Sequence, residues 1–347
     1  MKKDTLANLL LEWYEQNGRD LPWRVKGGAH PDPYVILVSE LMLQQTTVKT
    51  VIPYFYRFME KFPTVNALAA APLEEVYLYW QGLGYYSRAR SLHNTAQIIM
   101  QQYRGKFPQT KNEVLKLKGI GPYTAASFLA LAFNQPKTVV DGNVIRIICR
   151  LYNLEQPPAE IMPLIRQKAE ALTDEYHAAD YASAIMDLGA LICTPANPRC
   201  KDCPWQNRCQ ARQLGNAEKL PLRNKIAKPE KYGKVYLVFN RKGEVFIRKR
   251  TEKGLLSGLY EFPWSAERDL FPQTEPQDSR LNVTHVFTHF RLNLKIYTLH
   301  CENPDKDGIF TIPDNLKNYP FSTLMKKVYQ TYASSHTQLP LFTKVKS

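Results

Sequence analysis

The spacing of apolar residues changes once along this chain of 347 residues, and that change limits the fold more than any other feature. Up to about residue 211, apolar residues recur at helical spacing, and Gly and Pro separate the periodic segments. The segments are Leu6–Tyr14, Val35–Phe58, Leu73–Trp80, Leu92–Tyr103, Val114–Leu117, Ala125–Phe133, Val144–Tyr152, Ile161–Leu172 and Tyr181–Ile192. This part is predicted to be an all-α domain of about ten helices.

Strand-like alternation begins only after residue 234. Val235–Asn240 and Glu244–Arg250 flank a turn signal at residues 241–243, which predicts a β-hairpin. Leu292–Leu299 alternates apolar and polar residues like a half-buried strand, whereas Pro320–Ala333 returns to helical spacing. The chain is therefore predicted to hold a second, α+β domain.

The stretch between these two regions is polar and basic. It has no sustained apolar face, which predicts a helical domain at 1–215, a linker at 216–233 and an α+β domain at 234–347. Residues 1–215, 216–234 and 235–347 carry net charges of +5, +4 and +5, which make up the total of +14. So much positive charge suits a polyanion such as nucleic acid, although a merely basic soluble protein would show it too.

Two observations bear on location. The longest mainly apolar run, Ala125–Phe133, is interrupted only by Ser127 and is shorter than the ~20 residues that span a bilayer. The N-terminal segment soon acquires Asp4, Glu12 and Glu15, so it resembles an amphipathic helix and not a secretory signal. We expect a soluble, cytoplasmic protein without a membrane partner.

Four of the six cysteines fall in a short segment, as Cys193-x6-Cys200-x2-Cys203-x5-Cys209. Without a secretory signal, such a cluster points to metal binding and not to disulfides. Four thiolates suit a structural zinc or a [4Fe–4S] cluster, and the single Cys-x2-Cys pair with longer outer arms favours iron–sulfur. Cys149 and Cys301 are predicted to be small core residues.

The segment Leu117–Ala125 places Gly119 and Gly121 in a turn between two apolar-periodic segments. Glycines allow positive φ and close backbone approach, and Pro122 suits the first turn of a helix. Exposed N–H groups at such a helix start can hold a DNA phosphate. The pattern indicates a helix-hairpin-helix, with an ordinary helix–helix turn as the alternative.

Two carboxylates attract attention because of their surroundings. Glu40 stands in an otherwise apolar helical segment, where burial would raise its pKa and make it a general acid near neutral pH. Asp141 lies in the turn Val139–Val144, where an Asp is most often a helix cap. Periodicity alone leaves Glu40 on a solvent-exposed face as an alternative, and Asp141 becomes a catalytic candidate only with Glu40 as partner.

The loop Gln81–Arg90 combines two glycines, two tyrosines and two arginines, among them Arg88. Aromatic rings can stack in a base step and arginines can hold phosphates, so the loop is a candidate DNA contact. An ordinary aromatic turn is the alternative. Gln44 and Gln45, after Glu40, are amides able to hydrogen-bond base edges.

The hairpin, Asp141 and the cysteine spacing resemble the endonuclease III superfamily of DNA glycosylases. The segments SELMLQQT at 39–46 and GLGYYSRAR at 82–90, with the C-terminal domain, are similar to the MutY-type adenine DNA glycosylases in particular. The resemblance runs from about Leu6 to Tyr332. It implies a helix-hairpin-helix glycosylase domain, with a six-helix subdomain at about 30–137 and a cluster loop at 193–209, followed by a Nudix-like domain.

The resemblance also implies an activity, the removal of adenine paired with 8-oxoguanine or guanine in double-stranded DNA, by a monomeric enzyme of base-excision repair. Glu40 matches the acid that protonates adenine N7, Asp141 the carboxylate that stabilises the sugar cation, and Asn143 an amide that supports them. Cys193, Cys200, Cys203 and Cys209 match the ligands of a [4Fe–4S] cluster. Arg19, Trp23, Arg24 and Leu43 match the adenine pocket, and Gln45, Thr46, Leu83 and Tyr85 match the residues around the 8-oxoguanine that wedge the duplex open.

Bond cleavage of this kind passes through a cationic sugar. A proton from Glu40 would improve adenine as a leaving group, and the charge of Asp141 would stabilise the cation. Lyase relatives carry a Lys where this chain has Tyr123, so no amine is present there to form a Schiff base. We therefore expect a monofunctional enzyme.

The second domain resembles a Nudix fold through Gly254–Pro263, but only the scattered acids Glu267, Asp269 and Glu275 follow, so pyrophosphatase activity is not expected. The resemblance assigns 8-oxoguanine recognition to Phe287, Thr288 and His289. Thr288 replaces the Ser of many relatives, and Ser183 replaces a Glu or Gln that faces adenine. Two alternatives stay open, a bifunctional glycosylase/lyase and a non-catalytic iron–sulfur DNA-binding protein.

Overall fold

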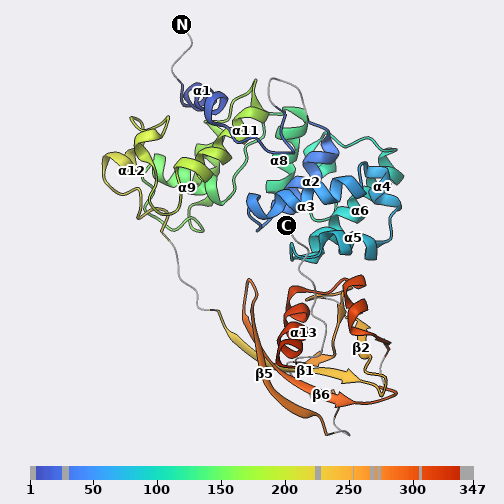
Figure 1. The fold of residues 1–347 in the computed structure, drawn as a ribbon. Helices are drawn as coiled ribbons and strands as arrows, with labels where there is room; N and C mark the ends of the chain where they lie inside the picture. Colours follow the sequence, from blue (N-terminus) through green and yellow to red (C-terminus); the bar gives the residue numbers. More distant parts are fainter. Residues whose placement is uncertain are drawn as a thin grey trace. The chain divides into compact units, whose positions relative to one another are not determined.

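The computed structural model separates the chain into two compact units, Met1–Ala70 with Ser91–Lys225, and Ala71–Arg90 with Ile226–Ser347 (Figure 1). Residues 71–90 thus group with the second unit, whereas the sequence pattern places them in the helical domain. The structure describes residues 5–25, 31–222, 228–252, 254–265, 270–271, 275–304 and 307–336.

All regular structure described before residue 223 is helical, which confirms the prediction for this region. A π-helical turn at Leu188–Ile192 and a 3-10 turn at Cys200–Asp202 accompany the α-helices. The α-helices are α1 (Leu6–Asn17), α2 (Pro33–Leu43), α3 (Val48–Lys61), α4 (Val65–Ala70), α5 (Leu73–Trp80), α6 (Tyr86–Tyr103), α7 (Lys111–Val114), α8 (Pro122–Phe133), α9 (Gly142–Leu151), α10 (Met162–Glu170), α11 (Ala178–Asp187) and α12 (Gln210–Gln213).

One segment with continuous helical spacing forms two helices in the structure. The apolar-periodic segment Val35–Phe58 breaks between α2 and α3, because Gln45 adopts a φ of 57° in the left-handed region. The span 30–137, predicted as a six-helix subdomain, contains α2 to α8, of which α7 is a single turn. Nothing in the described part of the chain is a helix long and apolar enough to cross a bilayer.

The two glycines of the predicted hairpin differ in backbone conformation and in the space available for a side chain. Gly119 has a φ of 75°, and a Cβ there would lie 2.4 Å from Cβ of Ser91, so no other residue fits. Gly121 precedes Pro122 at the start of α8 and has an ordinary negative φ of −90°, with open space where a Cβ would stand. Gly121 therefore leaves the helix start accessible, whereas Gly119 makes the turn.

Among its described residues after 225, the second unit contains the predicted mixed architecture, a seven-stranded sheet with the α-helix α13 (Thr323–Ser335). Its main path runs β3-β2-β1-β6-β5, with β4 paired to β1 and β7 to β2. The strands are β1 (Glu230–Phe239), β2 (Val245–Lys249), β3 (Tyr260–Glu261), β4 (Trp264–Ser265), β5 (Gln277–Val286), β6 (Arg291–His300) and β7 (Ile309–Thr311).

Antiparallel pairing of β1 with β2, Phe239 opposite Val245, confirms the predicted hairpin. The strand β1 also pairs in parallel with β6 along its whole length, from Glu230 opposite Arg291 onwards. The predicted linker at 216–233 is therefore wrong at its end, because its last residues are strand. Their exposed polar side chains gave no strand signal, and the pairing partner lies far away in sequence.

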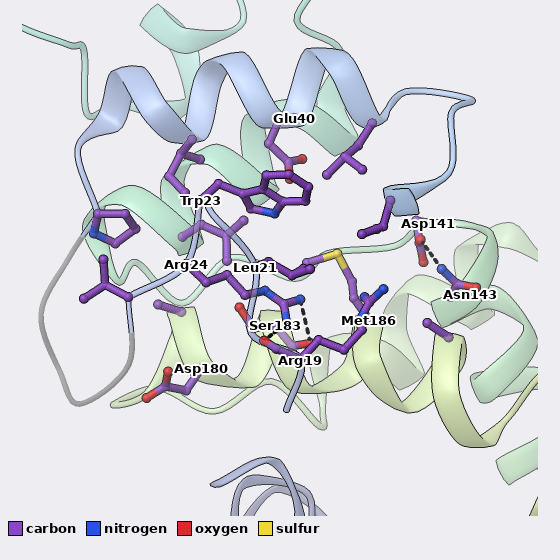
Figure 2. A pocket seen from close by; sticks show the side chains of 18 of the residues that line it. Arg19, Leu21, Trp23, Arg24, Glu40, Asp141, Asn143, Asp180, Ser183 and Met186 are labelled. Carbon is purple, nitrogen blue, oxygen red and sulfur yellow. Dashed lines mark hydrogen bonds between the residues drawn. The ribbon is translucent and has the colours of Figure 1, made fainter. Parts of the chain in front are cut away.

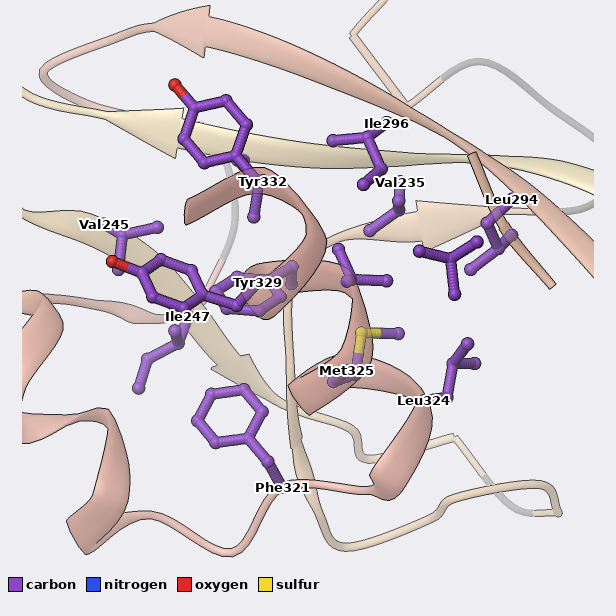
Figure 3. Packing of buried hydrophobic residues seen from close by; sticks show 14 of the residues in the cluster. Val235, Val245, Ile247, Leu294, Ile296, Phe321, Leu324, Met325, Tyr329 and Tyr332 are labelled. Carbon is purple, nitrogen blue, oxygen red and sulfur yellow. The ribbon is translucent and has the colours of Figure 1, made fainter. Parts of the chain in front are cut away.

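One face of the sheet is covered by α13 (Figure 3). Leu324, Met325 and Tyr329 of the helix pack with strand residues including Val235 and Ile296, all of them buried. The β5–β6 connection, which contains Phe287 to Phe290, lies at the end of an antiparallel hairpin that packs on this apolar layer.

Candidate active site

A pocket of about 780 Å³ opens in the first unit. Its walls come from the segment 19–25, α2, the start of α3, α8, the turn before α9, and α11 (Figure 2). The structure gathers in this pocket ten residues that the sequence singled out: Arg19, Trp23, Arg24, Glu40, Leu43, Thr46, Tyr123, Asp141, Asn143 and Ser183. Residues far apart in sequence thus form one site.

Glu40 is 5% exposed, within the apolar residues of α2, which excludes the solvent-exposed alternative. Burial raises the pKa of Glu40 to about 7. The Ser127 hydroxyl lowers that pKa, the nearby charge of Asp141 raises it, and the charge of Arg24 lowers it. The predicted rise is confirmed, and the carboxyl can carry a transferable proton at neutral pH.

Asp141 serves two roles at once. As N-cap of α9, its Oδ1 accepts a hydrogen bond from the backbone N–H of Val144 at 2.7 Å. Its Oδ2 accepts from Nδ2 of Asn143 at 2.9 Å, and the residue lines the pocket (Figure 2). The helix cap and the pocket carboxylate are therefore the same group, held by two N–H donors.

Asn143 is fixed from its other end. Its Oδ1 accepts from Nη2 of Arg146 at 2.9 Å, and Arg146 also donates to the carbonyls of Gly189 at 2.7 Å and Cys193 at 2.7 Å. A Cβ on Gly189 would lie 2.6 Å from Cβ of Asn143, so the π-helical turn passes very close to it. The orientation of Asn143, and through it Asp141, is set by this packing.

Tyr123 lies on α8 and interacts with both carboxylates and with Met186 of α11. Burial raises the pKa of Tyr123 well above its usual value, and the charges of Glu40 and Asp141 add to this. Its hydroxyl donates to Sδ of Met186 at 3.9 Å. The group at this position stays a neutral phenol over the working pH range.

Sequence reasoning missed Asp187, the last residue of α11. It is fully buried, and both of its oxygens accept from the pocket arginines, with Arg19 Nη2 at 2.6 Å and Arg24 Nη1 at 2.8 Å. Burial alone would raise the pKa of Asp187, but the hydrogen bonds and charges of Arg24 and Arg19 lower it below the usual value. The signal was available, because Asp187 is the one charged residue in the segment 181–192.

Two further pocket residues complete the wall. Trp23 is buried with its ring edge-to-face on Phe55, the centroids 5.3 Å apart. The backbone carbonyl of Ser183 accepts from Arg24 Nη2 at 3.4 Å, and its short side chain interacts with the Tyr14 hydroxyl. Ser183 therefore lines the pocket, but its short side chain does not extend far into it.

The four clustered cysteines are free thiols that line one small cavity, with Arg150 and Arg212 beside them. Arg150 Nη1 lies 3.4 Å from Sγ of Cys193, and burial raises the pKa of Cys203 to about 12. Among the residues described, no group of three or more His, Cys, Asp or Glu side chains is arranged to hold a metal ion. Four thiols around one cavity with adjacent positive charge suit a [4Fe–4S] cluster.

Cys149 and Cys301 have separate surroundings. Cys149 is buried in the core cluster of the first unit, and Cys301 packs against a cluster of the second. Both are the core residues that the sequence predicted.

In the second unit, the loop 81–90 has an exposed tyrosine on a strained backbone. Tyr85 is 44% exposed at a φ of 48°, a left-handed conformation rare for an aromatic residue, whereas Leu83 is buried. The prediction that Arg88 contacts a DNA phosphate is wrong. It is buried, and its Nη2 donates to the carbonyls of Leu83 at 3.1 Å and Gly84 at 3.2 Å, so it holds the turn.

The turn between β5 and β6 carries Phe287, Thr288 and His289, the last two exposed. The Phe287 N–H donates to the Phe290 carbonyl at 2.8 Å, which closes the turn. The Thr288 hydroxyl is hydrogen-bonded to the Tyr85 hydroxyl at 2.6 Å. Two residues that the sequence assigned to the same lesion are therefore in contact. Of the acids after Pro263, Glu267 and Asp269 lie outside the described residues.

Comparison with known proteins agrees with this arrangement. Residues 38–170 match the family model described as "HhH-GPD superfamily base excision DNA repair protein", and residues 234–331 match the NUDIX domain. The chain is 37% identical to the adenine DNA glycosylase of Buchnera aphidicola subsp. Schizaphis graminum, over 94% of this chain and 98% of the relative. It is 32% identical to the human adenine DNA glycosylase, over 93% of this chain and 73% of the relative.

Among solved structures, a thermostable thymine-DNA glycosylase superposes with a TM-score of 0.53 at 29% identity. The match covers 60% of this chain and 95% of that one. It therefore supports a glycosylase fold for a part of this chain only.

Proposed function

The chain belongs to the adenine DNA glycosylases of the HhH-GPD superfamily, and from this premise we propose that it excises adenine paired with 8-oxoguanine or guanine in double-stranded DNA. The single observation that carries the proposal is the pairing of a protonatable Glu40 with Asp141 in one pocket. The proposal includes that the enzyme is a monomer of base-excision repair and that it is cytoplasmic, or associated with the nucleoid if the source is bacterial.

The chemistry follows from the two carboxyl groups. Glu40 donates its proton to N7 of the adenine, and the bond between the base and C1′ breaks with its electrons going to the base. The sugar becomes an oxocarbenium-like cation, which the negative charge of Asp141 stabilises while Asn143 keeps that carboxylate oriented. Water then adds to C1′ and loses a proton. Acid catalysis of this kind contributes about 10²- to 10⁴-fold to the rate.

The remaining walls of the pocket would hold the base after it leaves the stack. Trp23 and Leu43 offer apolar surface, Arg19 and Arg24 offer N–H donors, and Ser183 leaves room for a water-mediated contact. Tyr123 provides no amine, so a Schiff base cannot form there and strand cleavage is not part of the reaction.

We assign opening of the duplex to residues at strained or exposed turns. Gln45 and Tyr85 both adopt left-handed backbone conformations, and Thr46 and Leu83 adjoin them. Phe287, Thr288 and His289 would contact the 8-oxoguanine, and the Thr288–Tyr85 hydrogen bond supports a shared role. Gly119 and Gly121 would present backbone N–H groups to a phosphate.

Cys193, Cys200, Cys203 and Cys209 would hold a [4Fe–4S] cluster, since their four thiols line one cavity beside Arg150 and Arg212. When bound, the cluster would join the four cysteine positions and fix the fold of this loop. The deprotonated sulfurs would then be compensated by the neighbouring arginines. No step of base release is assigned to it.

A single-turnover assay tests the proposal. Duplexes with adenine opposite 8-oxoguanine, guanine or cytosine are incubated with the enzyme, and strand breaks are measured with and without alkali. We expect breaks only after alkali, fastest opposite 8-oxoguanine, and none with Glu40→Gln. The matched control is Glu60→Gln, an exposed Glu on α3. Full activity of Glu40→Gln would refute the proposed acid, and alkali-independent breaks with borohydride trapping would establish the lyase alternative.

A further inference from the structure

Two arginines that line the pocket bind Asp187, a residue to which the proposed reaction gives no role. Asp187 is fully buried at the end of α11, and the guanidinium groups of Arg19 and Arg24 both bind it. The two arginines together donate five hydrogen bonds to the Asp187 carboxylate. Arg19 donates through its backbone N–H at 2.8 Å, Nε at 2.8 Å and Nη2 at 2.6 Å, and Arg24 through Nη1 at 2.8 Å and Nη2 at 2.9 Å.

These contacts place one negative charge against two positive charges. Arg24 is further confined, because its Nη2 reaches the Ser183 carbonyl at 3.4 Å and its guanidinium lies over the Tyr14 ring at 5.9 Å. Both ends of its guanidinium are thus turned to Asp187 and the backbone. Arg24 nevertheless lines the same pocket as Glu40 (Figure 2).

An arginine beside a general acid works against it, since positive charge favours the carboxylate form. The charge of Arg24 does lower the pKa of Glu40. A buried partner that neutralises Arg24 therefore protects the proton that the reaction needs. The charged and titratable residues lining the pocket with Glu40 are Arg19, Arg24, Lys49, Tyr123, Asp141, Tyr176, His177 and Asp180.

We propose that Asp187 is a positioning residue that holds Arg19 and Arg24 as one fixed unit and keeps Arg24 from pairing with Glu40. The proposal rests on the proposed function for its consequence in catalysis, but the charge balance itself can be measured without turnover. Without Asp187, two guanidinium groups would repel each other, and Arg24 would be free to turn towards Glu40.

The direct test is the titration of Glu40 by ¹³C NMR of glutamate carboxyl groups, with its resonance identified by its loss in Glu40→Gln. In Asp187→Asn, we expect the titration midpoint to fall by roughly 0.5 to 1 pH unit. In Arg24→Gln it should rise, and in the double variant it should return towards the wild-type value. Glu160→Gln, which removes an exposed carboxylate outside the pocket, should leave it unchanged.

An unchanged or raised midpoint in Asp187→Asn would overturn the proposal. If Asp187→Asn does not fold, Arg24→Gln is the deciding variant. A Glu40 midpoint that does not rise in Arg24→Gln contradicts the proposed effect of Arg24 on Glu40. The pH dependence of single-turnover adenine release should move in parallel with the NMR midpoints. If the Glu40 midpoint shifts as expected in the variants but the wild-type protein never releases adenine, the proposed function is refuted and the role of Asp187 is not.

Discussion

Because its pKa is raised, Glu40 is expected to lower the free energy of unfolding at pH values where its carboxyl group is ionised. A carboxyl with a pKa of about 7 in the folded protein and an ordinary value of 4.5 when unfolded binds its proton more tightly in the folded state. Its contribution to stability is therefore fully present below pH 4.5 and is lost as the pH rises through 7. Replacing Glu40 by Gln removes this pH dependence.

The magnitude follows from the two values. A difference of about 2.5 units corresponds to about 3 kcal/mol, since each unit is worth 1.36 kcal/mol. Most of this, about 2 to 3 kcal/mol, should be lost between pH 5 and pH 8. Because the side chain is almost fully buried, solvent screening takes little from the figure.

The assay is urea unfolding of wild type, Glu40→Gln and the surface control Glu60→Gln at about pH 5 and about pH 8. The transition of the helical unit should move to lower urea from pH 5 to pH 8 by more in wild type and Glu60→Gln than in Glu40→Gln. At pH 8 the inactive Glu40→Gln should be the more stable protein. Equal pH dependence in all three proteins would show that Glu40 titrates normally, and the proposed acid would lose its support.

Three further predictions concern other parts of the structure. Gly119→Ala should lower the free energy of unfolding by about 2 kcal/mol or more, because of its positive φ and the clash, whereas Gly121→Ala should melt like wild type and bind duplex DNA more weakly. Arg88→Met should slow adenine release without reducing the salt dependence of DNA binding, which a lost phosphate contact would lower by about one unit of slope. Asp141→Asn should keep the cap on Val144, and circular dichroism should show an intact fold, while base release falls by about 10²-fold or more.

The helical segments and the β1–β2 hairpin could be predicted from the sequence because apolar spacing is local information. The break at Gln45 could not, because no Gly or Pro marks it and the left-handed φ is imposed by the surroundings. The start of β1 at Glu230 was hidden for a similar reason. Its side chains are exposed, and its hydrogen bonds go to a strand some sixty residues later in the chain.

The candidate site shows the same limit. Glu40 could be proposed from sequence because a charged residue in an apolar helix is conspicuous, and the structure buries it. Asp187 offered the same signal, but its meaning depends on Arg19 and Arg24, more than 160 residues earlier in the chain. Arg88 was misread because a basic residue in an aromatic loop suggests phosphate, and only the fold shows it bound to the loop carbonyls.

The pocket must satisfy two opposed electrostatic demands, and its construction shows how. A leaving base needs a neutral acid, which low polarity around Glu40 provides, whereas the sugar cation needs a fixed negative charge. Asp141 meets the second demand because it is also a helix cap, with N–H donors from Val144 and Asn143 on its two oxygens. Because those donors are the backbone N–H of Val144 and the side-chain amide of Asn143, both on α9, the charge is held by neutral groups and not directly by an arginine. An arginine in that place would have lowered the pKa of Glu40 as Arg24 does, so capping separates the two carboxyl groups in function although they share one pocket.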